Sequence, residues 1–504
     1  MSGHEIVVGG TGTGKTMYAA VYKAMKSFEM NSPICYIDPK GTDYYQILWW
    51  LSETNEGQWY YQQNRHRILF LNPLAKSDWL LAFNAIKPIG EFVHHNPDLV
   101  ALTATSMTDF LRRQSGYEQF EAPRMQNILN AGIGTLIEGG KGHFTLYDLP
   151  LLFRPYYDPT SRRREPSLYN PVVEFMLRGV EHQGTRMFWE DQWPTWSAQA
   201  RRDWVQSSLS RVFQYIFDQR CLLTICDVRG TLDFQRVVDE GCWLFVHLPE
   251  SLLKTSTALL GNLIVTSLFY ACMRNPKRGY SYRLVLDEAY LFNSGPLSDI
   301  YVRARYCQLW ITLIVQYLNQ MASVSGGHTD ERLKEAALSN AQYLTVFNDP
   351  EDAEYLASRI LPPTGREILK FDPYMRETKY KTMWQEQADN EYFFSTLKPR
   401  EVVLYNRTGE YSVRTTPYVR IGEIDEGRVN MFEAEHLMAT GRPAYQIEGD
   451  LMRRHEFLAG MLKPKAVPTP EAPVRAQTTP TPAAGKPSSK SKEEAPLPPF
   501  RKVL

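Results

Sequence analysis

The chain has 504 residues, of which 43% are apolar and 12% aromatic, and its 56 basic residues balance its 56 acidic ones. This length supports about two globular domains with accessory segments, which excludes a peptide-like binder. The balanced charge excludes a global bias toward nucleic acid or membrane, so any nucleic-acid surface must be local. The six cysteines are sparse, and most lie in apolar runs where a thiol packs as a small hydrophobic group, which indicates a reducing cytosol.

The amino-terminal residues have the pattern of a strand, a glycine-rich loop and a helix. Residues 5–8 are rich in β-branched side chains, and residues 15–28 carry apolar side chains at helical spacing. The loop Gly9-Gly10-Thr11-Gly12-Thr13-Gly14-Lys15-Thr16 has its glycines, lysine and threonine at the offsets of a phosphate-binding loop. Backbone N–H groups of such a loop wrap the phosphates, and the helix directs its positive dipole end at the same anion.

We predict that this loop binds a nucleoside triphosphate with Mg²⁺. Lys15 would hold the β and γ phosphates, and the Thr16 hydroxyl would bind the metal. The predicted nucleotide-binding residues are Gly9, Gly12, Thr13, Gly14, Lys15 and Thr16. The alternative is a glycine-rich turn before a helix, without a ligand.

Further strand-like runs alternate with helical patterns, which predicts an α/β fold with a mainly parallel sheet and helices on both faces. These runs lie at residues 34–37, 68–71, 243–248, 284–287, 310–315 and 343–347. From about residue 91 to residue 224 helical periodicity replaces the strand signal and indicates an all-helical insertion.

The carboxyl-terminal third begins with a predicted hairpin. Two alternating segments flank Thr408-Gly409-Glu410 between residues 401 and 419, and a helical pattern follows. The last residues are rich in proline and lysine and cannot bury enough apolar surface to order themselves. The predicted division is a nucleotide-binding domain at 1–90 and 225–425, the helical insertion at 91–224, a helical extension at 426–463 and a disordered tail at 464–504.

No signal segment and no transmembrane segment are predicted. The phosphate loop begins nine residues into the sequence, which leaves no cleavable leader ahead of it. The longest apolar stretch, residues 258–273, is short for a bilayer and contains Asn262, Thr266 and Ser267. We expect it to be a buried helix.

A pair of acids follows one of the predicted strands. In Arg283-Leu284-Val285-Leu286-Asp287-Glu288 the two carboxylates stand at the carboxyl end of a buried-type strand, where open α/β sheets bind their ligands. Asp287 can hold Mg²⁺, and Glu288 can orient or deprotonate the attacking water. The alternative is a solvated helix start.

Three further polar residues are candidates for the same site. Gln316 ends the predicted strand at 310–315 and can sense the γ-phosphate or position water; alternatively it faces solvent. Arg303 and Arg305 precede that strand and can stabilise charge at a neighbouring subunit's nucleotide, as an arginine finger does, or form surface salt bridges.

Together these motifs resemble the TraG/TraD-type coupling ATPases of conjugation and type IV secretion, which belong with the FtsK/HerA-like motors. The resemblance rests on the acid pair, on Arg305 eleven residues before Gln316, and on the segments Ile37-Asp38-Pro39-Lys40-Gly41 and Gln316-Tyr317-Leu318-Asn319-Gln320. It covers about residues 1–420, including Asp233-Phe234-Gln235-Arg236-Val237-Val238-Asp239-Glu240-Gly241. The residues themselves give no role for Asp38 and Lys40, and a tight turn is the alternative there.

The resemblance implies a RecA-like domain interrupted by an all-helical domain, a hexameric ring with sites between subunits, and ATP hydrolysis coupled to movement of DNA or of a nucleoprotein. By position it implies that Gly14, Lys15 and Thr16 bind nucleotide and that Asp287 binds the metal. It further implies that Glu288 activates water, Gln316 senses phosphate and Arg305 is the finger.

The sequence departs from the family in two places. Coupling proteins of this type typically carry a membrane anchor ahead of the loop, whereas this sequence reaches the loop at once. We expect either a soluble variant or a start that lies upstream. The segment Arg305-Tyr306-Cys307-Gln308-Leu309 replaces the small and glycine residues usual after the finger arginine, which alters the expected turn.

Other candidate sites are weaker. The basic loop Ser161-Arg162-Arg163-Arg164-Glu165, together with four tryptophans near two arginines, could grip a nucleic-acid strand or could be helix-packing core with a solvated face. The second group comprises Trp189, Trp193, Trp196, Trp204, Arg201 and Arg202. Cys221 and Cys226 lack a second pair nearby and His94-His95 lacks a third ligand, so Mg²⁺ is the only metal predicted.

The main hypothesis is therefore an ATP-driven DNA translocase of the coupling class that hydrolyses ATP between subunits of a hexamer. Its predicted partners are DNA and a relaxase or secretion-channel protein, and its predicted location is the cytoplasm, with peripheral contact at the inner membrane. The alternatives are a nucleotide-dependent recruitment module that docks a protein without moving DNA, and a defence or plasmid-maintenance ATPase on the same core.

Overall fold

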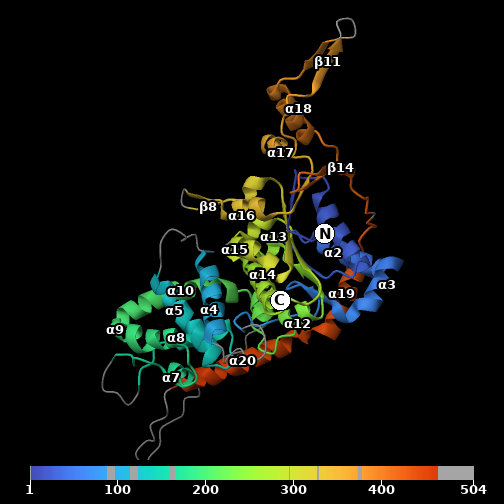
Figure 1. The fold of residues 1–504 in the computed structure, drawn as a ribbon. Helices are drawn as coiled ribbons and strands as arrows, with labels where there is room; N and C mark the ends of the chain where they lie inside the picture. The colour runs from blue at the N-terminus through green and yellow to red at the C-terminus, as the bar shows by residue number, and fades with distance from the viewer. Residues whose placement is uncertain are drawn as a thin grey trace, which may run out of the picture. The chain divides into compact units, whose positions relative to one another are not determined.

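The computed structural model of the protein describes residues 2–87, 97–113, 123–158, 165–293, 296–325, 328–372, 377–419 and 421–463. Its centre is a nine-stranded sheet in the order β14-β13-β10-β1-β7-β6-β2-β5-β3 (Figure 1). The strands are β1 (Glu5–Val8), β2 (Ile34–Asp38), β3 (Ile68–Leu71), β5 (Trp243–His247), β6 (Tyr282–Leu286), β7 (Leu309–Val315), β10 (Tyr343–Val346), β13 (Glu401–Asn406) and β14 (Tyr411–Thr415).

The sheet is parallel from β10 to β3, and the β10–β13 and β13–β14 pairs are antiparallel. Strand β1 lies between β10 and β7, with Val8 opposite Val346 on one side and Val315 on the other. Each strand predicted from the sequence is present to within two residues at its ends, and so is the hairpin. The prediction of a mainly parallel α/β sheet is therefore confirmed.

Both faces of the sheet are buried, because successive side chains of a strand point to opposite faces. Ile6 and Val8 of β1 belong to one apolar core, whereas Val7 belongs to the other. Helices α14 (Thr255–Arg274) and α15 (Pro296–Arg303) cover the first face. The second face is covered by α1 (Lys23–Glu29), α2 (Thr42–Glu53) and α19 (Glu426–Thr440), and Figure 1 shows the two groups on opposite sides.

The helix after the phosphate loop differs from the regular helix expected at residues 15–28. Residues Met17–Tyr22 form a π-helix, and α1 continues from Lys23 to Glu29. A single wider turn shifts the register of the helix by about one residue, which a short apolar pattern cannot distinguish from regular spacing.

Helices dominate the stretch between β4 (Trp79–Leu80) and β5, with no strand among its described residues. The longest are α4 (Pro97–Arg113), α5 (Pro123–Glu138) and α10 (Ala198–Ile216), and the shorter ones are α6 (Leu149–Leu152), α7 (Pro171–Leu177), α8 (Gln183–Met187), α9 (Trp193–Thr195), α11 (Gln219–Ile225) and α12 (Phe234–Asp239). The boundaries of a separate helical domain stay a prediction.

One helix, α14, is long and apolar enough to cross a membrane by length and composition alone. In the fold, 72% of its apolar window is buried, and it packs against α12 and α15. This is the burial of a core helix, as expected for residues 258–273.

All six cysteines are buried and free.

Of the remaining helices and strands, one lies between α2 and β3 and the others follow β5. They are α3 (Asn55–Asn64), α13 (Glu250–Leu253), α16 (Arg332–Asn340), α17 (Ala353–Ile360), α18 (Met383–Ser395), α20 (Ala444–Met461) and the short strands β8 (Ser323–Ser325), β9 (His328–Asp330), β11 (Ile368–Asp372), β12 (Glu377–Tyr380) and β15 (Arg442–Pro443). The helical extension expected at 426–463 corresponds to α19 and α20. The tail at 464–504 lies outside the described residues.

Candidate nucleotide-binding site

The phosphate loop follows β1 at the carboxyl edge of the sheet. Gly12 and Gly14 have φ of 78° and 99°, the left-handed region that glycine tolerates best. The side chains of Thr13 and Lys15 both bond to the carbonyl oxygen of Gly10, each at 2.9 Å. The loop is therefore folded back on itself, with the Lys15 ammonium on its concave side.

The predicted acid pair meets this loop. Asp287 follows β6 and is 1% exposed, and Glu288 next to it is 6% exposed with φ of 44°. Strands β6 and β1 are both neighbours of β7, so their carboxyl ends open at the same edge. The structure brings residues 9–16 and 287–288, which are far apart in the chain, to the same edge of the sheet, and their role in binding a nucleotide stays a prediction.

Lys40 is the member of this site whose role the sequence did not reveal. Its Nζ lies 2.7 Å from Glu288 Oε1, 3.1 Å from Asp287 Oδ2 and 3.4 Å from Thr16 Oγ1. Burial disfavours the charged ammonium, but the two carboxylates outweigh this effect and raise the pKa of Lys40. The lysine thus places a positive charge where the loop hydroxyl and the acid pair converge.

Asp38 explains how Lys40 reaches this position. Its Oδ1 accepts hydrogen bonds from the backbone N–H groups of Lys40 and Gly41 at 2.9 and 2.8 Å, and its Oδ2 accepts one from Tyr44 at 2.8 Å. Gly41 has φ of 87°, and a Cβ there would lie 2.8 Å from His247 Cε1. The Asp-Pro-Lys-Gly segment is therefore a tight turn, as the alternative interpretation held, and the turn aims Lys40 at the acids.

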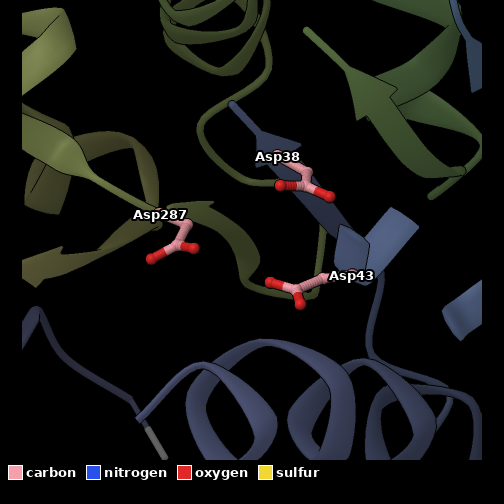
Figure 2. A group of neighbouring side chains, drawn as sticks. All are labelled: Asp38, Asp43 and Asp287. Atoms are coloured by element: carbon pink, nitrogen blue, oxygen red, sulfur yellow. The ribbon is translucent and has the colours of Figure 1, made fainter. Parts of the chain in front are cut away.

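Three buried carboxylates lie close together near Lys40. One oxygen of each of Asp38, Asp43 and Asp287 lies within 4.8 Å of the others, and all three residues are buried (Figure 2). Asp43 Oδ2 accepts the hydrogen bond of the Tyr36 hydroxyl at 2.8 Å. Asp287 accepts hydrogen bonds from the Lys40 ammonium at 3.1 Å and from the backbone N–H of Glu288 at 3.0 Å, so all three carboxylates have protein donors.

Burial sets the ionisation of the acids. It raises the pKa of Asp287 to about 6, although the nearby Lys40 charge acts in the opposite direction. Burial, together with the Asp38 charge, raises the pKa of Asp43 to about 8. For Lys15, burial and the Lys40 ammonium lower the pKa. The site thus holds the ammonium groups of Lys15 and Lys40 and several carboxylates in a buried region. Because burial disfavours each of these charges, the site favours a further ligand that neutralises them.

The residues present fit Mg²⁺. The Thr16 hydroxyl and the Asp287 carboxylate are hard oxygen ligands, and both already approach one cationic group, the Lys40 ammonium. The metal and Lys40 would compete for the same oxygens, since Asp287 Oδ2 is the atom that Lys40 approaches.

Gln316, which follows β7, lies beside Glu288 and the phosphate loop. Its Nε2 lies 3.4 Å from Glu288 Oε1, and its Oε1 accepts from the Thr11 hydroxyl at 3.3 Å. The backbone N–H of Gln316 donates to Gln320 Oε1 at 2.7 Å. The glutamine therefore links the phosphate loop to Glu288 rather than facing solvent alone.

Arg303 and Arg305 lie elsewhere. Both precede β7, so they stand at the amino edge of the sheet, opposite the edge that carries the phosphate loop. Both are exposed. Neither can contribute to the nucleotide site of its own chain, and the finger role stays a prediction about a neighbouring subunit.

In the tryptophan group of the helical region, Trp189 and Trp193 belong to the core, and Trp196 and Trp204 are half-buried against it. Trp189 is fully buried and Trp193 is 6% exposed, and their indoles donate to Thr135 Oγ1 and to the Leu168 carbonyl. Arg201 covers Trp193 with its guanidinium 5.4 Å from the ring. The buried rings of Trp189 and Trp193 cannot stack on bases, which excludes these two residues from a nucleic-acid surface. Arg162, Arg163 and Arg164 lie outside the described residues, as do His94 and His95.

Comparison with known proteins supports the fold. No protein-family model matches the chain, and no curated protein matches it. The bacterial conjugative coupling protein TrwBdeltaN70, in its unbound form, matches with a TM-score of 0.53 and 13% identity over 84% of this chain and 86% of that one. The plasmid coupling protein TrwB bound to the non-hydrolysable ATP analogue ADPNP, and TrwB bound to the GTP analogue GDPNP, each match with a TM-score of 0.53 and 14% identity over 83% and 86%.

At this identity the likeness shows the fold alone. The chain has the fold of a conjugative coupling protein, and the resemblance drawn from its motifs is confirmed at that level. The predicted α/β fold, a mainly parallel sheet with helices on both faces, is therefore shared with these coupling proteins.

Proposed function

We propose that this chain is an ATP-hydrolysing motor of the conjugative coupling class, which moves DNA with the free energy of ATP hydrolysis. The observation that carries the proposal is the convergence of Lys15, Thr16, Asp287, Glu288 and Gln316 at one edge of a sheet that has the fold of TrwB. TrwB is a coupling protein whose structure contains an ATP analogue. ATP is the proposed ligand of this chain.

The proposed roles follow from the chemistry of each group. Lys15 binds the β and γ phosphates, and Thr16 and Asp287 hold Mg²⁺, which when bound neutralises phosphate charge. Glu288 accepts a proton from the attacking water or orients it, and Gln316 holds that water beside Glu288. Lys40 would have to move away from Asp287 for Mg²⁺ to bind there, because its ammonium approaches the Oδ2 atom that would be the metal ligand.

We further propose that the active form is a ring, with Arg305 completing the site of the adjacent subunit. The exposed position of Arg305 before β7 supports this. The residue lies away from the nucleotide site of its own subunit and is accessible to a neighbouring subunit. A guanidinium there would stabilise charge on the transferred phosphoryl group. The proposed number of subunits is six.

DNA is the proposed cargo, and a relaxase or channel protein is the proposed partner, at the cytoplasmic side of the inner membrane. A second candidate function is ATP-governed docking of a protein. The exposed apolar side chains of α18, Met383, Trp384 and Tyr392 at 58%, 78% and 71% exposure, favour this candidate because they provide a surface for a protein.

Steady-state ATP hydrolysis with and without single- and double-stranded DNA tests the proposal. We expect DNA to stimulate hydrolysis and Glu288→Gln to bind nucleotide with turnover lowered about 100-fold or more. Glu435→Gln, an exposed glutamate of α19, is the matched control and should behave like the wild type. Turnover that ignores DNA would favour protein docking, and wild-type protein that binds no nucleotide would refute both functions.

A further inference from the structure

Arg400, the residue before β13, contacts the phosphate loop. The backbone N–H of Arg400 donates to the carbonyl oxygen of Thr13 at 3.1 Å. Arg400 has φ of 72°, which an arginine rarely adopts, and its Cγ lies 3.7 Å from the point where Gly14 would carry a Cβ. An unusual backbone conformation thus holds this arginine against the loop.

The side chain of Arg400 is only partly satisfied. Its Nη2 donates to the Thr416 carbonyl at 2.7 Å, but its Nε is buried and has no hydrogen-bond partner in the part of the chain that the structure describes. The guanidinium lies 5.2 Å from the centre of the Tyr418 ring. Tyr418 is 72% exposed, so the ring presents apolar surface to solvent beside a donor that lacks an acceptor.

The direction of a bound triphosphate follows from the strand order. Asp287, Glu288 and Gln316 follow β6 and β7, on one side of β1. The γ-phosphate would face these residues, because Asp287 is the proposed metal ligand and Glu288 and Gln316 are the proposed water-binding residues. Arg400 and Tyr418 flank the β13–β14 hairpin, on the other side of β1 beyond β10. A triphosphate bound across the loop with its γ-phosphate near the acids therefore places its nucleoside near the β13–β14 hairpin.

We infer that Arg400 and Tyr418 form the binding site for the nucleoside part of the nucleotide. The Tyr418 ring stacks on the base, and the half-buried guanidinium of Arg400 beside it donates to an oxygen of the ribose or α-phosphate. Stacking tolerates any base, since every base has a π-face. This site rests on the proposed function, because it requires that the phosphate loop bind a nucleotide.

Binding of ATP and of inorganic triphosphate, each measured with Mg²⁺ by titration calorimetry, tests the inference. Triphosphate has no nucleoside, so it reports on the phosphate loop alone. We expect Tyr418→Ala to weaken ATP binding about tenfold or more and to leave triphosphate binding unchanged. Tyr418→Phe keeps the ring and should bind ATP like the wild type. Tyr411→Ala, which removes an exposed tyrosine from the other end of β14, is the matched control and should change neither affinity.

Arg400→Gly tests the guanidinium with little backbone strain, because glycine accepts the left-handed conformation. It should also weaken ATP binding while triphosphate binding persists. Equal affinities of wild type and Tyr418→Ala for ATP, or equal losses for ATP and triphosphate, would overturn the nucleoside site. A wild-type protein that binds neither ligand would instead overturn the proposed function, so the two failures are distinguishable.

Discussion

The ammonium nitrogen of Lys40 lies 2.7 Å from Oε1 of Glu288, and these two residues are separated by more than two hundred positions in the chain. The lysine is 37% exposed, whereas the glutamate side chain is 8% exposed. The pair therefore stabilises a carboxylate that would otherwise be buried without a counter-charge.

Lys40→Met should destabilise the protein without nucleotide, because it leaves the charges of Asp287 and Glu288 buried together. Breaking a buried ion pair costs about 3–5 kcal/mol, and the partial exposure of Lys40 reduces the expected loss to about 1–3 kcal/mol. Urea unfolding measures this. Lys26→Met removes a surface pair with Glu29 and should cost well under 1 kcal/mol.

The same variant tests whether Lys40 and the metal compete. Mg²⁺–ADP should stabilise Lys40→Met more than it stabilises the wild type, since the metal supplies the missing charge and no lysine has to move. Equal stabilisation of the two proteins would contradict competition at Asp287.

Gln316→Ala should lower ATP turnover about 100-fold and change nucleotide affinity little, because its amide contacts Glu288 rather than the Lys15 side of the loop. Rapid-quench hydrolysis beside equilibrium binding of ATP separates the two effects. A parallel loss of affinity would mean that Gln316 supports the loop, through its contact with Thr11, instead of positioning water.

Arg305→Ala and Lys15→Ala should each abolish hydrolysis, and mixing the two proteins should restore part of it. A site in a mixed ring works when one subunit supplies an intact loop and its neighbour an intact Arg305. Random equimolar mixing therefore recovers about a quarter of wild-type activity. Activity that stays absent after subunit exchange, with ring assembly verified by sedimentation, would exclude a finger acting between subunits.

His247→Phe should make stability less dependent on pH below neutrality. Burial lowers the pKa of His247 to about 4, and the ring lies between Tyr44 and Tyr45 at 4.9 and 5.0 Å. The unfolded chain takes up this proton near pH 6.5 and the folded protein only near pH 4, so stability is lost as the pH falls between these values. The lost contribution is about 1.4 kcal/mol at pH 5.5.

Urea unfolding of wild type and His247→Phe at pH 7.5 and 5.5 measures this contribution. Between pH 7.5 and pH 5.5, the unfolding free energy of the wild type should fall by that amount relative to the unfolding free energy of the variant. A difference that is independent of pH would show that His247 keeps its ordinary pKa in the fold.

The phosphate loop, the acid pair and the strands that carry them could be predicted because each is a local pattern. Glycines at fixed offsets, a lysine before a helix, and β-branched runs ending in acids are decided by neighbours within a few residues. Gln316 belongs to the same class, since its place at a strand end follows from the run before it. The sequence alone thus determined the nucleotide edge of the sheet.

Only the tertiary structure decided which distant residues complete that edge. Asp38 and Lys40 were noticed as a motif, but the contact of Lys40 with Asp287 exists because β2 pairs with β6, which no local pattern encodes. The tryptophans near Arg201 could not be assigned to core or surface until helix packing buried Trp189. Arg400 gave no signal, because its role arises from the return of β13 to the loop beyond β10. Strand order is set by the burial of whole faces, and it alone determines which side chains share a site.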